Sequence, residues 1–400
     1  MSGAGGGRRA LLISENEAVP RDRRVWNEAR SLAAADWDVS VAVPFDEEYE
    51  QSAHETVDGI EIHRFPLRPA AGAADYAREY GQAVLRLRSL VGRLARRRPF
   101  DVVHTANPPD FLLWSARSAR RRGAAFVFDH HDLMPELFRA RFRRSGLPYK
   151  GLLALERQAL RSADAVISTN ESYKRIAIER GGVEPDDVFV VRNGPDLANF
   201  TPVDPDPGLR ADRRFLLAYV GVMEPQDGVD QAIHALATLR ARRGADWKAI
   251  FVGEGSERPE MEALAASLGV ADSVEFAGWR EDGDIRRILS SADLCLAPDP
   301  PSPLNDVSTM MKVPEYMAMG APIASFDLPE TRVSAGDAAA YAAPTPTAFG
   351  ELVDDLLNDE SRRRRMAAVA LERVSELSWE RSTERLLAAY ERAVANRRRS

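Results

Sequence analysis

Short apolar runs alternate with longer helical patterns along almost the whole chain, and this alternation limits the possible fold more than any other feature. Alternating strands and helices are typical of βαβ units, in which the strands are parallel and the helices cover the sheet. We therefore predict parallel α/β architecture. The first series of expected strands comprises Ala10–Ser14, Val39–Val43, Val102–His104, Ala125–Asp129, Ala165–Ser168 and Val188–Arg192.

A second series follows the segment Asn199–Arg210, which is rich in Pro and Asp and carries little helix or strand signal. Two such series predict two doubly wound, Rossmann-like domains, residues 1–195 and 196–378, that face a central cleft. Residues 379–400 are predicted to form a helix that returns to the first domain. The second series comprises Leu216–Gly221, Lys248–Gly253, Val274–Ala277, Leu294–Ala297, Pro322–Ser325 and Ala340–Tyr341.

The residue inventory excludes several classes of protein. Cys295 is the single cysteine, which excludes an internal disulfide and a CxxC motif, and the six His show no HExxH or HxxxH spacing. No metal site and no cofactor are therefore predicted. A net charge of −7 argues against a general nucleic-acid binder. The chain also contains no GxxxxGK[ST] phosphate loop and no GxSxG nucleophile elbow.

No stretch approaches the 18 or so apolar residues of a membrane span, and the run Ala10–Ile13 is too short for a signal-peptide core. We therefore expect a cytoplasmic protein. Residues 78–150 nevertheless carry 16 Lys and Arg against 6 Asp and Glu. This excess is either an ordinary solvated face or a patch that contacts the inner face of the plasma membrane. The patch would add Arg139, Arg141, Phe142, Arg143, Arg144 and Lys150 to a basic helix near residues 80–97.

The segment Asn305–Gly320 is the strongest candidate for chemistry, and it follows an expected strand. Ser308 or Thr309 is expected to cap a helix, whose N-terminus can hold an anion through its free N–H groups. Lys312 and Glu315 are three residues apart and share one helical face. The cation suits a diphosphate and the carboxylate suits ribose hydroxyls, although a surface ion pair would have the same spacing.

A second polar cluster, Asp129-His130-His131-Asp132, comes directly after an expected buried strand. A histidine in this position can contact a sugar hydroxyl or a leaving group. The alternative is helix capping by Asp132, with Glu136 in the first turn. Two His flanked by two Asp exceed what capping requires, which favours a functional role for at least one of them.

Backbone and charge at other strand ends add further candidates. Gly221 and Gly253 end two expected strands of the second domain, where glycine lets the backbone approach a phosphate closely. Turns between strands and helices require glycine in any case, so this indication is weak. Arg24 lies in the charged run after the first strand, which either is solvated or meets an anionic acceptor or diphosphate. That run contains no GxGxxG motif, which argues against a dehydrogenase.

Taken together, these segments resemble glycosyltransferase family 4, whose members are retaining enzymes of GT-B fold. The resemblance covers nearly the whole chain and rests on the two-domain pattern, on Lys312–Ile323 and on Ser378-Trp379-Glu380. It is most specific toward bacterial surface-polysaccharide transferases with a Lys-x-x-Glu-Tyr-Met-Ala signature. His131-Asp132 with Pro135-Glu136, Asn193-Gly194 and Ser334-Ala335-Gly336 are also similar to that subgroup.

The resemblance implies sugar transfer from a nucleoside diphosphate sugar, with retention at the anomeric carbon and without a metal. Glu315 matches the carboxylate that holds the ribose, Lys312 the group that neutralises the departing diphosphate, and His131 the histidine near the donor sugar. Further donor contacts are expected from Gly221, Gly253, Trp279, Arg280, Asn305, Ser308 and Thr309. Contacts with the acceptor or the diphosphate are expected from Arg24, Asp132, Arg192 and Asn193.

The chain departs from the family pattern in two places. The usual motif has two Glu eight positions apart, and Val307 stands at the first of them. Asn305 or Asp306 is expected to take over the sugar-binding role, and Asp306 is therefore a catalytic candidate. Met223–Gln226 replaces the usual Arg and Lys of the first loop in the second domain, so Lys312 must neutralise more of the diphosphate charge.

Three functional hypotheses remain at this point. The first is transfer of a sugar to a lipid-linked or surface-glycan acceptor. The second is the same donor chemistry on a small secondary metabolite. The third, from a different class, is a non-catalytic protein that binds nucleotide sugars.

Overall fold

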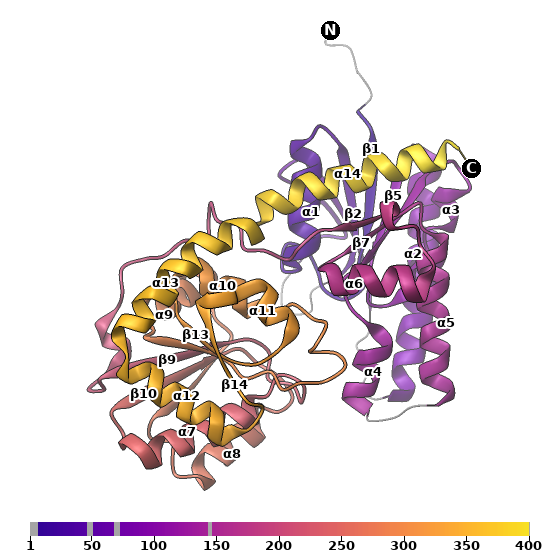
Figure 1. Ribbon diagram of the computed structural model, residues 1–400. Coiled ribbons are helices and arrows are strands. Elements are labelled where there is room, and N and C mark those ends of the chain that lie inside the picture. The colour runs from indigo at the N-terminus through magenta and orange to yellow at the C-terminus, as the bar shows by residue number, and fades with distance from the viewer. Residues whose placement is uncertain (1–6, 46–50, 68–72, 143–145, 400) are drawn as a thin grey trace. The chain divides into compact units, whose positions relative to one another are not determined.

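The computed structural model describes residues 7–45, 51–67, 73–142 and 146–399 (Figure 1), without the side chains of residues 73–80 and 141. The chain forms two compact units. The first contains Met1–Arg192 and Ser382–Ser400, and the second contains Asn193–Arg381. The units divide three residues from the boundaries expected from the sequence. Helix α14 (Trp379–Arg397) begins in the second unit and belongs to the first from Ser382 onward.

The first unit is built on an eight-stranded sheet with the order β3-β4-β2-β1-β5-β6-β7-β8. All neighbouring strands are parallel except the β3–β4 pair, which is an antiparallel hairpin. The strand order reverses between β1 and β5. The carboxyl ends of these two strands therefore form a topological switch point, which is where ligands bind in such sheets. The strands are β1 (Arg9–Ile13), β2 (Asp38–Pro44), β3 (His54–Val57), β4 (Ile60–Phe65), β5 (Val102–Ala106), β6 (Ala125–His130), β7 (Ala165–Ser168) and β8 (Val188–Val190).

Helices α1 and α2 bury apolar faces in the core of this unit. Helix α1 begins where the Asp22 carboxylate accepts the N–H of Val25 at 3.1 Å, and it buries Val25, Ala29 and Leu32. Helix α2 buries Val84, Leu87 and Val91. The helices are α1 (Arg23–Ala34), α2 (Ala73–Arg97), α3 (Arg117–Arg120), α4 (Met134–Phe142), α5 (Leu147–Ser162) and α6 (Glu171–Ile176), with part of α14.

The expected basic patch is only partly described. Arg143 and Arg144 lie outside the described residues, and the side chain of Arg141 is also not described. Arg139 stacks on the ring of Tyr149, with 5.3 Å between its guanidinium carbon and the ring centroid. Among the described residues, no helix combines the length and the apolar character that crossing a membrane requires.

The second unit is built on a six-stranded, wholly parallel sheet with the order β11-β10-β9-β12-β13-β14. Its strand order reverses between β9 and β12. Cys295 lies in β12 and is buried. The strands are β9 (Phe215–Val220), β10 (Trp247–Val252), β11 (Val274–Gly278), β12 (Leu294–Ala297), β13 (Ile323–Phe326) and β14 (Ala339–Ala342).

The helices of the second unit include one that the sequence pattern did not reveal. Helix α13 contains four consecutive arginines, Arg362–Arg365, which obscure its apolar period, yet it buries Met366, Ala370 and Val374 at intervals of four. The helices are α7 (Val229–Arg243), α8 (Arg258–Ser267), α9 (Asp282–Ser291), α10 (Lys312–Ala318), α11 (Pro329–Ala335), α12 (Pro346–Asn358) and α13 (Glu360–Val374), followed by the start of α14.

Candidate active site

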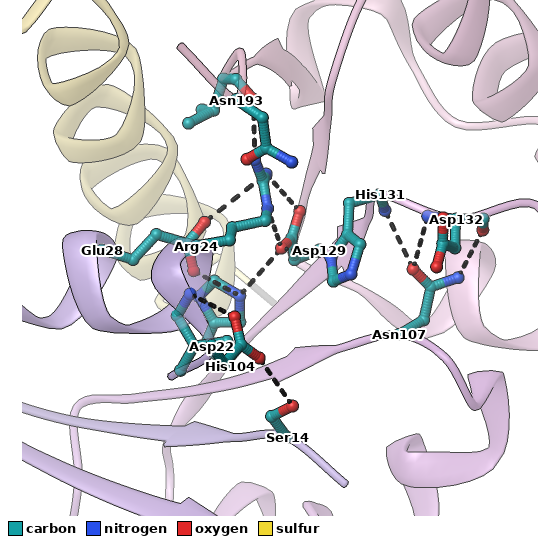
Figure 2. A network of polar contacts seen from close by, with 12 residues as sticks. Ser14, Asp22, Arg24, Glu28, His104, Asn107, Asp129, His131, Asp132 and Asn193 are labelled. Atoms are coloured by element: carbon teal, nitrogen blue, oxygen red, sulfur yellow. Dashed lines mark hydrogen bonds and ion pairs between the residues drawn. The ribbon is translucent and has the colours of Figure 1, made fainter. Parts of the chain in front are cut away.

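A buried ionic cluster lies at the carboxyl ends of β5 and β6 in the first unit (Figure 2). Helix α1 supplies Arg24 and Glu28, which are four residues apart and therefore share one face. Strand β5 supplies His104, and strand β6 supplies Asp129. His131 follows β6 directly, so that its ring lies next to the Asp129 carboxylate.

Arg24 and Asp129 form a two-pronged ion pair. Arg24 Nε donates to Asp129 Oδ2 and Nη2 donates to Oδ1, both at 2.7 Å. Burial raises the pKa of Asp129, but the charges of Arg24 and His131 outweigh it and hold that pKa well below its usual range. The remaining nitrogen, Nη1, donates to the carbonyl of Val191 at 3.2 Å. Arg24 is thus the counter-ion of a buried carboxylate, and its expected contact with an acceptor or diphosphate stays a prediction.

His131 is oriented by the same carboxylate. Its Nδ1 lies 2.9 Å from Asp129 Oδ2, which fixes the tautomer that carries a proton on Nδ1 and leaves Nε2 as an acceptor. Burial lowers the pKa of His131, but the charge and hydrogen bond of Asp129 raise it by more, so the net shift is upward. The His131 side chain keeps 16% of its surface exposed. It is therefore a polar group with a fixed orientation and access to solvent.

The loop that carries His131 is held by Asn107. The Asn107 Oδ1 atom accepts the backbone N–H groups of His131 at 2.9 Å and of Asp132 at 3.0 Å. Its Nδ2 donates to the Asp132 carbonyl at 2.7 Å and to Asp110 Oδ1 at 2.8 Å. All four hydrogen bonds fix backbone or buried groups, so Asn107 sets the position of the His131-Asp132 turn. The pKa of the Asp132 carboxyl is raised, chiefly by burial.

Behind Asp129, two further buried groups are held in their neutral forms. Burial and the nearby Asp129 charge raise the pKa of Glu28 well above its usual range, and burial lowers the pKa of His104 to about 4. His104 Nε2 lies 3.6 Å from Glu28 Oε2 and 4.0 Å from Asp129 Oδ2. On its other side, His104 Nδ1 is 2.9 Å from the hydroxyl of Tyr390 on α14. The charge of this cluster is therefore carried by Arg24 and Asp129, together with His131 when it is protonated.

Sequence reasoning did not find the supporting residues of this cluster. Glu28 lies on α1, His104 and Asn107 in and directly after β5, and Tyr390 on α14, so the three places are distant in the sequence and no spacing joins them. The Arg24–Glu28 interval on an expected helix was the one available signal, because it places both residues on one helical face.

In the second unit, Lys312 occupies a buried position at the carboxyl ends of β9 and β12. Its side chain is 6% exposed, and Nζ lies 2.5 Å from Asp299 Oδ1 and 4.0 Å from Asp227 Oδ1. Nζ also lies 5.0 Å from the centroid of the Tyr219 ring, within the range of a cation–π contact. Burial lowers the pKa of Lys312, but the two carboxylates raise it by more, so the ammonium stays charged.

The carboxylates around Lys312 were also missed from the sequence. Asp299 is 1% exposed, and its Oδ2 is buried without a hydrogen-bond partner among the described residues. Burial raises the pKa of Asp227 to about 6. Asp299 stands in the proline-rich stretch after β12 and Asp227 in the loop after β9, and neither belongs to a motif.

Two predicted glycines have the geometry that a close backbone approach requires. Gly221 has a φ of +155°, and a Cβ there would lie 2.9 Å from the Tyr219 hydroxyl and 3.1 Å from Lys312 Cε. Gly253 has a φ of +131°, and its Cβ would lie 1.9 Å from the Gly221 carbonyl oxygen. Both positions exclude a side chain, and the Gly221 position keeps the neighbourhood of Lys312 free of one.

The start of α10 differs from the prediction. The helix begins at Lys312 after Met311, with no side-chain capping bond, and Ser308 Oγ instead donates to the Leu304 carbonyl at 2.8 Å. The predicted cap by Ser308 or Thr309 is therefore wrong. The Asn305–Met311 stretch makes local turns, which keeps both hydroxyls outside the helix.

Asn305 is buried and acts within its own loop. Its Nδ2 donates to the carbonyls of Gln226 at 2.9 Å and Pro300 at 2.8 Å, so the amide fastens the loop after β12 to the loop after β9. This use of the amide differs from the sugar contact expected from the sequence. Asp306 next to it is half-buried.

The other candidates lie at different places in the two units. Glu315 is half-buried on α10, and Trp279, 55% exposed, follows β11 with Arg280, whose Nη1 donates to the Trp279 carbonyl at 2.9 Å. Arg192 ends the first unit, and its carbonyl accepts from Ser382 Oγ at 2.9 Å. Asn193 begins the second unit, where its Nδ2 lies 4.0 Å from the sulfur of Met311.

Tyr316, the residue after Glu315, links α10 to the sheet. Strands β9 and β12 pair only through Leu294–Leu217 and Cys295–Ala218, and beyond these pairs they separate. The Tyr316 hydroxyl fills the gap: it accepts the N–H of Val220 at 2.9 Å and lies 3.1 Å from the carbonyl of Leu296. This buried contact fixes α10, and with it Lys312, against the switch point of the sheet.

Comparisons with known proteins agree with this architecture. Residues 22–194 match the glycosyl transferase 4-like domain, and residues 214–359 match the glycosyl transferases group 1 domain. Among solved structures, sucrose-phosphate synthase from Thermosynechococcus elongatus superposes with a TM-score of 0.78 and 18% identity, covering 97% of this chain and 99% of that one. HepE of Anabaena, solved with UDP and glucose, gives 0.71 at 16% identity, with 95% and 98% covered. At these identities the likeness shows the fold alone.

Curated relatives align over shorter stretches. The D-inositol 3-phosphate glycosyltransferase of Salinispora tropica is 28% identical over 264 residues, 61% of this chain and 54% of that protein. The 2-deoxystreptamine glucosyltransferase of Streptomyces kanamyceticus is 26% identical over 246 residues, 58% and 61% of the two chains. The chain thus spans little more than half the length of these relatives. The two matched domains together nevertheless take in more than half of the chain, which therefore belongs to the glycosyl transferases that combine a 4-like domain with a group 1 domain in the GT-B fold.

Proposed function

We propose that this protein is a retaining glycosyltransferase that moves a sugar from a nucleoside diphosphate sugar to a hydroxyl of a small polyhydroxylated acceptor. The observation that carries this proposal is Lys312, a buried ammonium kept charged by Asp299 and Asp227 at the carboxyl end of the second sheet. A buried cation beside Gly221, which directly follows β9 and has no side chain, suits an anion such as a diphosphate. Nothing in this proposal requires a metal.

The chemical reason is the charge that develops on the leaving group. When the bond between the anomeric carbon and the diphosphate breaks, negative charge accumulates on the phosphate oxygens, and a preorganised cation stabilises it. Asp299 keeps Lys312 protonated and in place before the donor arrives, and the missing side chain at Gly221 leaves room beside Lys312 Cε. Glu315 on the same helix would accept the ribose hydroxyls, and exposed Trp279 would stack on the base.

In the first unit, His131 is the group best suited to a sugar hydroxyl. Asp129 holds its Nδ1 proton, so Nε2 is oriented as an acceptor of fixed direction. Such a contact positions the donor sugar, and Asp129 raises the pKa of the imidazole above its ordinary value. We assign Arg24 and Asn107 a supporting role, because their polar atoms are bonded to Asp129 and to the His131 turn.

The acceptor class is suggested by the relatives. Both curated relatives named above are transferases whose names specify a cyclitol acceptor, D-inositol 3-phosphate or 2-deoxystreptamine. A small acceptor of this kind replaces the lipid-linked or surface-glycan acceptor as the favoured hypothesis. The Lys-x-x-Glu-Tyr-Met-Ala sequence at 312–318 favours the glycan acceptor, which stays the second candidate.

The test is a crossed screen of donors and acceptors with the full chain. UDP, GDP, ADP and dTDP sugars are incubated with inositol phosphates, aminocyclitols and a polyprenyl diphosphate-linked sugar, with EDTA or with Mg²⁺. Product mass identifies the acceptor, and the anomeric coupling constant in NMR reports retention or inversion. Transfer to a cyclitol with retention supports the proposal. Transfer to the polyprenyl-linked sugar alone supports the second candidate, whereas nucleotide binding without transfer or donor hydrolysis indicates a binding protein.

A further inference from the structure

The β3–β4 hairpin of the first unit gathers two histidines and a glutamate on one face, away from the ionic cluster described above. His54 on β3 stands directly opposite His63 on β4 in the antiparallel register. Glu61 is two residues before His63 and so points to the same side of β4. One ligand-type atom from each of these three residues lies within 4.8 Å of the others. We call these three residues the hairpin triad.

The triad contains a buried polar atom that the protein leaves unsatisfied. His63 Nε2 is buried and makes no hydrogen bond within the described residues, although it lies 3.6 Å from Glu61 Oε2. A buried unpaired nitrogen costs free energy unless a further partner is bound.

The surroundings of the triad hold its two inner members in place. Ser40 on β2 stands opposite Glu61, and its hydroxyl lies 3.2 Å from Glu61 Oε2. On the other face of β4, Ile60 and Ile62 are fully buried and anchor the strand to the core. An outer hydrogen bond to a ligating carboxylate and a rigid strand are features of built metal sites.

We propose that the hairpin triad is a binding site for a borderline divalent transition metal, with Zn²⁺ as its best match. Two imidazole nitrogens and one carboxylate oxygen form a donor set suited to Zn²⁺, and solvent completes a tetrahedron. Mg²⁺ and Ca²⁺ prefer oxygen ligands and octahedral or higher coordination, so they do not match this donor set.

Metal binding requires a small change at His54. In the structure the His54 and His63 rings stack, with centroids 4.6 Å apart and planes 15° from parallel. The lone pairs of parallel rings do not converge on one point, so one ring must turn about its Cβ–Cγ bond. His54 is exposed and can turn, whereas His63 is largely enclosed. The bound metal would then join β3 to β4 at the edge of the sheet.

The ionic cluster of the first unit does not carry the same proposal. Glu28, His104 and Asp129 also place ligand-type atoms within 4.8 Å of one another. There, however, both Asp129 oxygens already accept hydrogen bonds from Arg24, whose guanidinium would repel a second cation. In the hairpin triad, by contrast, the hydrogen bond to Glu61 Oε2 comes from the neutral Ser40 hydroxyl, and no guanidinium bonds to a triad member within the described part of the chain.

The experiment uses the full chain after treatment with EDTA and gel filtration. Calorimetric titration with ZnCl₂ should give one site per chain with micromolar or tighter affinity, and MgCl₂ should give none. Co²⁺ should bind the same site and produce the visible absorption of a tetrahedral N/O complex. The melting temperature should rise with Zn²⁺, because a ligand that binds only the folded state stabilises it.

The variants decide whether the hairpin triad is the site. His54→Gln and His63→Gln should each remove Zn²⁺ binding, and Ser40→Ala should weaken it about 10-fold or more. His234→Gln, at an exposed histidine on α7, is the matched control and should bind like the unaltered protein. Far-UV circular dichroism checks that the variants fold. Zn²⁺ binding that persists in both hairpin variants, or that disappears in His104→Gln, overturns the proposal, as does an affinity weaker than millimolar.

Discussion

At the scale of single residues, this protein surrounds each candidate catalytic group with charges that set its protonation. Lys312 keeps its proton because Asp299 and Asp227 outweigh its burial, and His131 titrates above its ordinary range because Asp129 does the same. Removing the partner should therefore change the chemistry of the group more than its position.

Asp129→Asn should lower the pKa of His131 below the value in the unaltered protein, because the neutral amide removes the charge that raises it. Protonation of His131 contributes stability that is complete below pH 6.5, its ordinary pKa, and is lost as the pH rises through the higher folded-state pKa. The variant should lose this decrease of stability with rising pH. If neutral His131 is the active form, the rise of kcat/KM with pH should move to lower pH.

Histidine ring NMR measures this shift directly. The substitution also leaves Arg24 without its counter-ion, so unfolding should be about 3–5 kcal/mol easier. An unchanged His131 midpoint in a folded variant would show that Asp129 does not set its protonation.

Lys312→Ala should lower kcat by about 10- to 1000-fold, because it removes the cation that stabilises the departing diphosphate. It also leaves Asp299 buried and unpaired, so a loss of stability is expected as well. The double variant Lys312→Ala/Asp299→Ala should recover stability without recovering kcat. Lys248→Ala removes a surface lysine paired with Glu275 at 2.7 Å and should stay close to the unaltered rate. Recovery of kcat in the double variant would contradict the assigned role.

The sequence selected the candidate catalytic and binding groups but not the groups that hold them in place. Lys312, Glu315 and His131 stand in compact motifs, and spacing or resemblance was enough to select them. Asp299, Asn107 and Tyr390 act through contacts made only after folding, and their neighbours in the sequence carry no periodic signal. The predicted cap at Ser308 or Thr309 failed because local turns delay the helix until Lys312.

At the scale of elements, the crevice between β9 and β12 is the feature that positions chemistry in the second unit. Its strands separate after two residue pairs, and α10 supplies a tyrosine hydroxyl to the exposed backbone. The tyrosine of the Lys-x-x-Glu-Tyr sequence is thus a structural residue beside two candidate functional ones. Because Tyr316 fixes α10 against the sheet, it also fixes the position of Lys312, which begins the same helix.

Tyr316→Phe should destabilise the second unit by about 1–3 kcal/mol, because the Val220 N–H and the Leu296 carbonyl then lose a buried partner. Chemical denaturation followed by circular dichroism gives the difference. Tyr341→Phe is the control, since that hydroxyl is only partly buried and donates to the Gly336 carbonyl at 2.8 Å. If both variants lose the same free energy of unfolding, the contact in the crevice stabilises the protein no more than the Tyr341 hydrogen bond does.

The parallel strands other than β4 were easier to predict than the β3–β4 hairpin and helix α13. The expected strands lie within two residues of the observed ones because buried parallel strands form apolar runs bounded by turns. The hairpin was missed because β3, His54–Val57, is exposed or half-buried at every position. Helix α13 was missed because four arginines interrupt its apolar face.

At the scale of the whole molecule, the first unit is discontinuous in sequence. Its sheet comes from the first half of the chain, and the last part of α14 packs on it through Tyr390, whose ring lies 5.3 Å from that of Trp37. Ser31 and Thr383 also join α1 to α14, with 3.1 Å between their hydroxyl oxygens. In Figure 1 the yellow C-terminal helix accordingly lies beside the indigo N-terminal elements.

A fragment of residues 1–192 should therefore lack a cooperative unfolding transition, because the surface under α14 is left exposed. Addition of a synthetic peptide of residues 379–400 should restore cooperative melting and shift the titration of His104, which contacts Tyr390. A peptide with Tyr390→Ala and Leu386→Ala, two buried residues of α14, is the matched control. A sharp transition in the fragment alone would show that the first unit folds without the terminal helix.

The same discontinuity affects how the protein is made. Residues 1–192 emerge from the ribosome before Ser382–Ser400 are translated. The first unit therefore lacks its last helix during the synthesis of the whole second unit. His104 then remains without its Tyr390 partner until α14 is translated. A stop codon placed at Ser382 would consequently damage the unit that is made first, while the second unit could fold undisturbed.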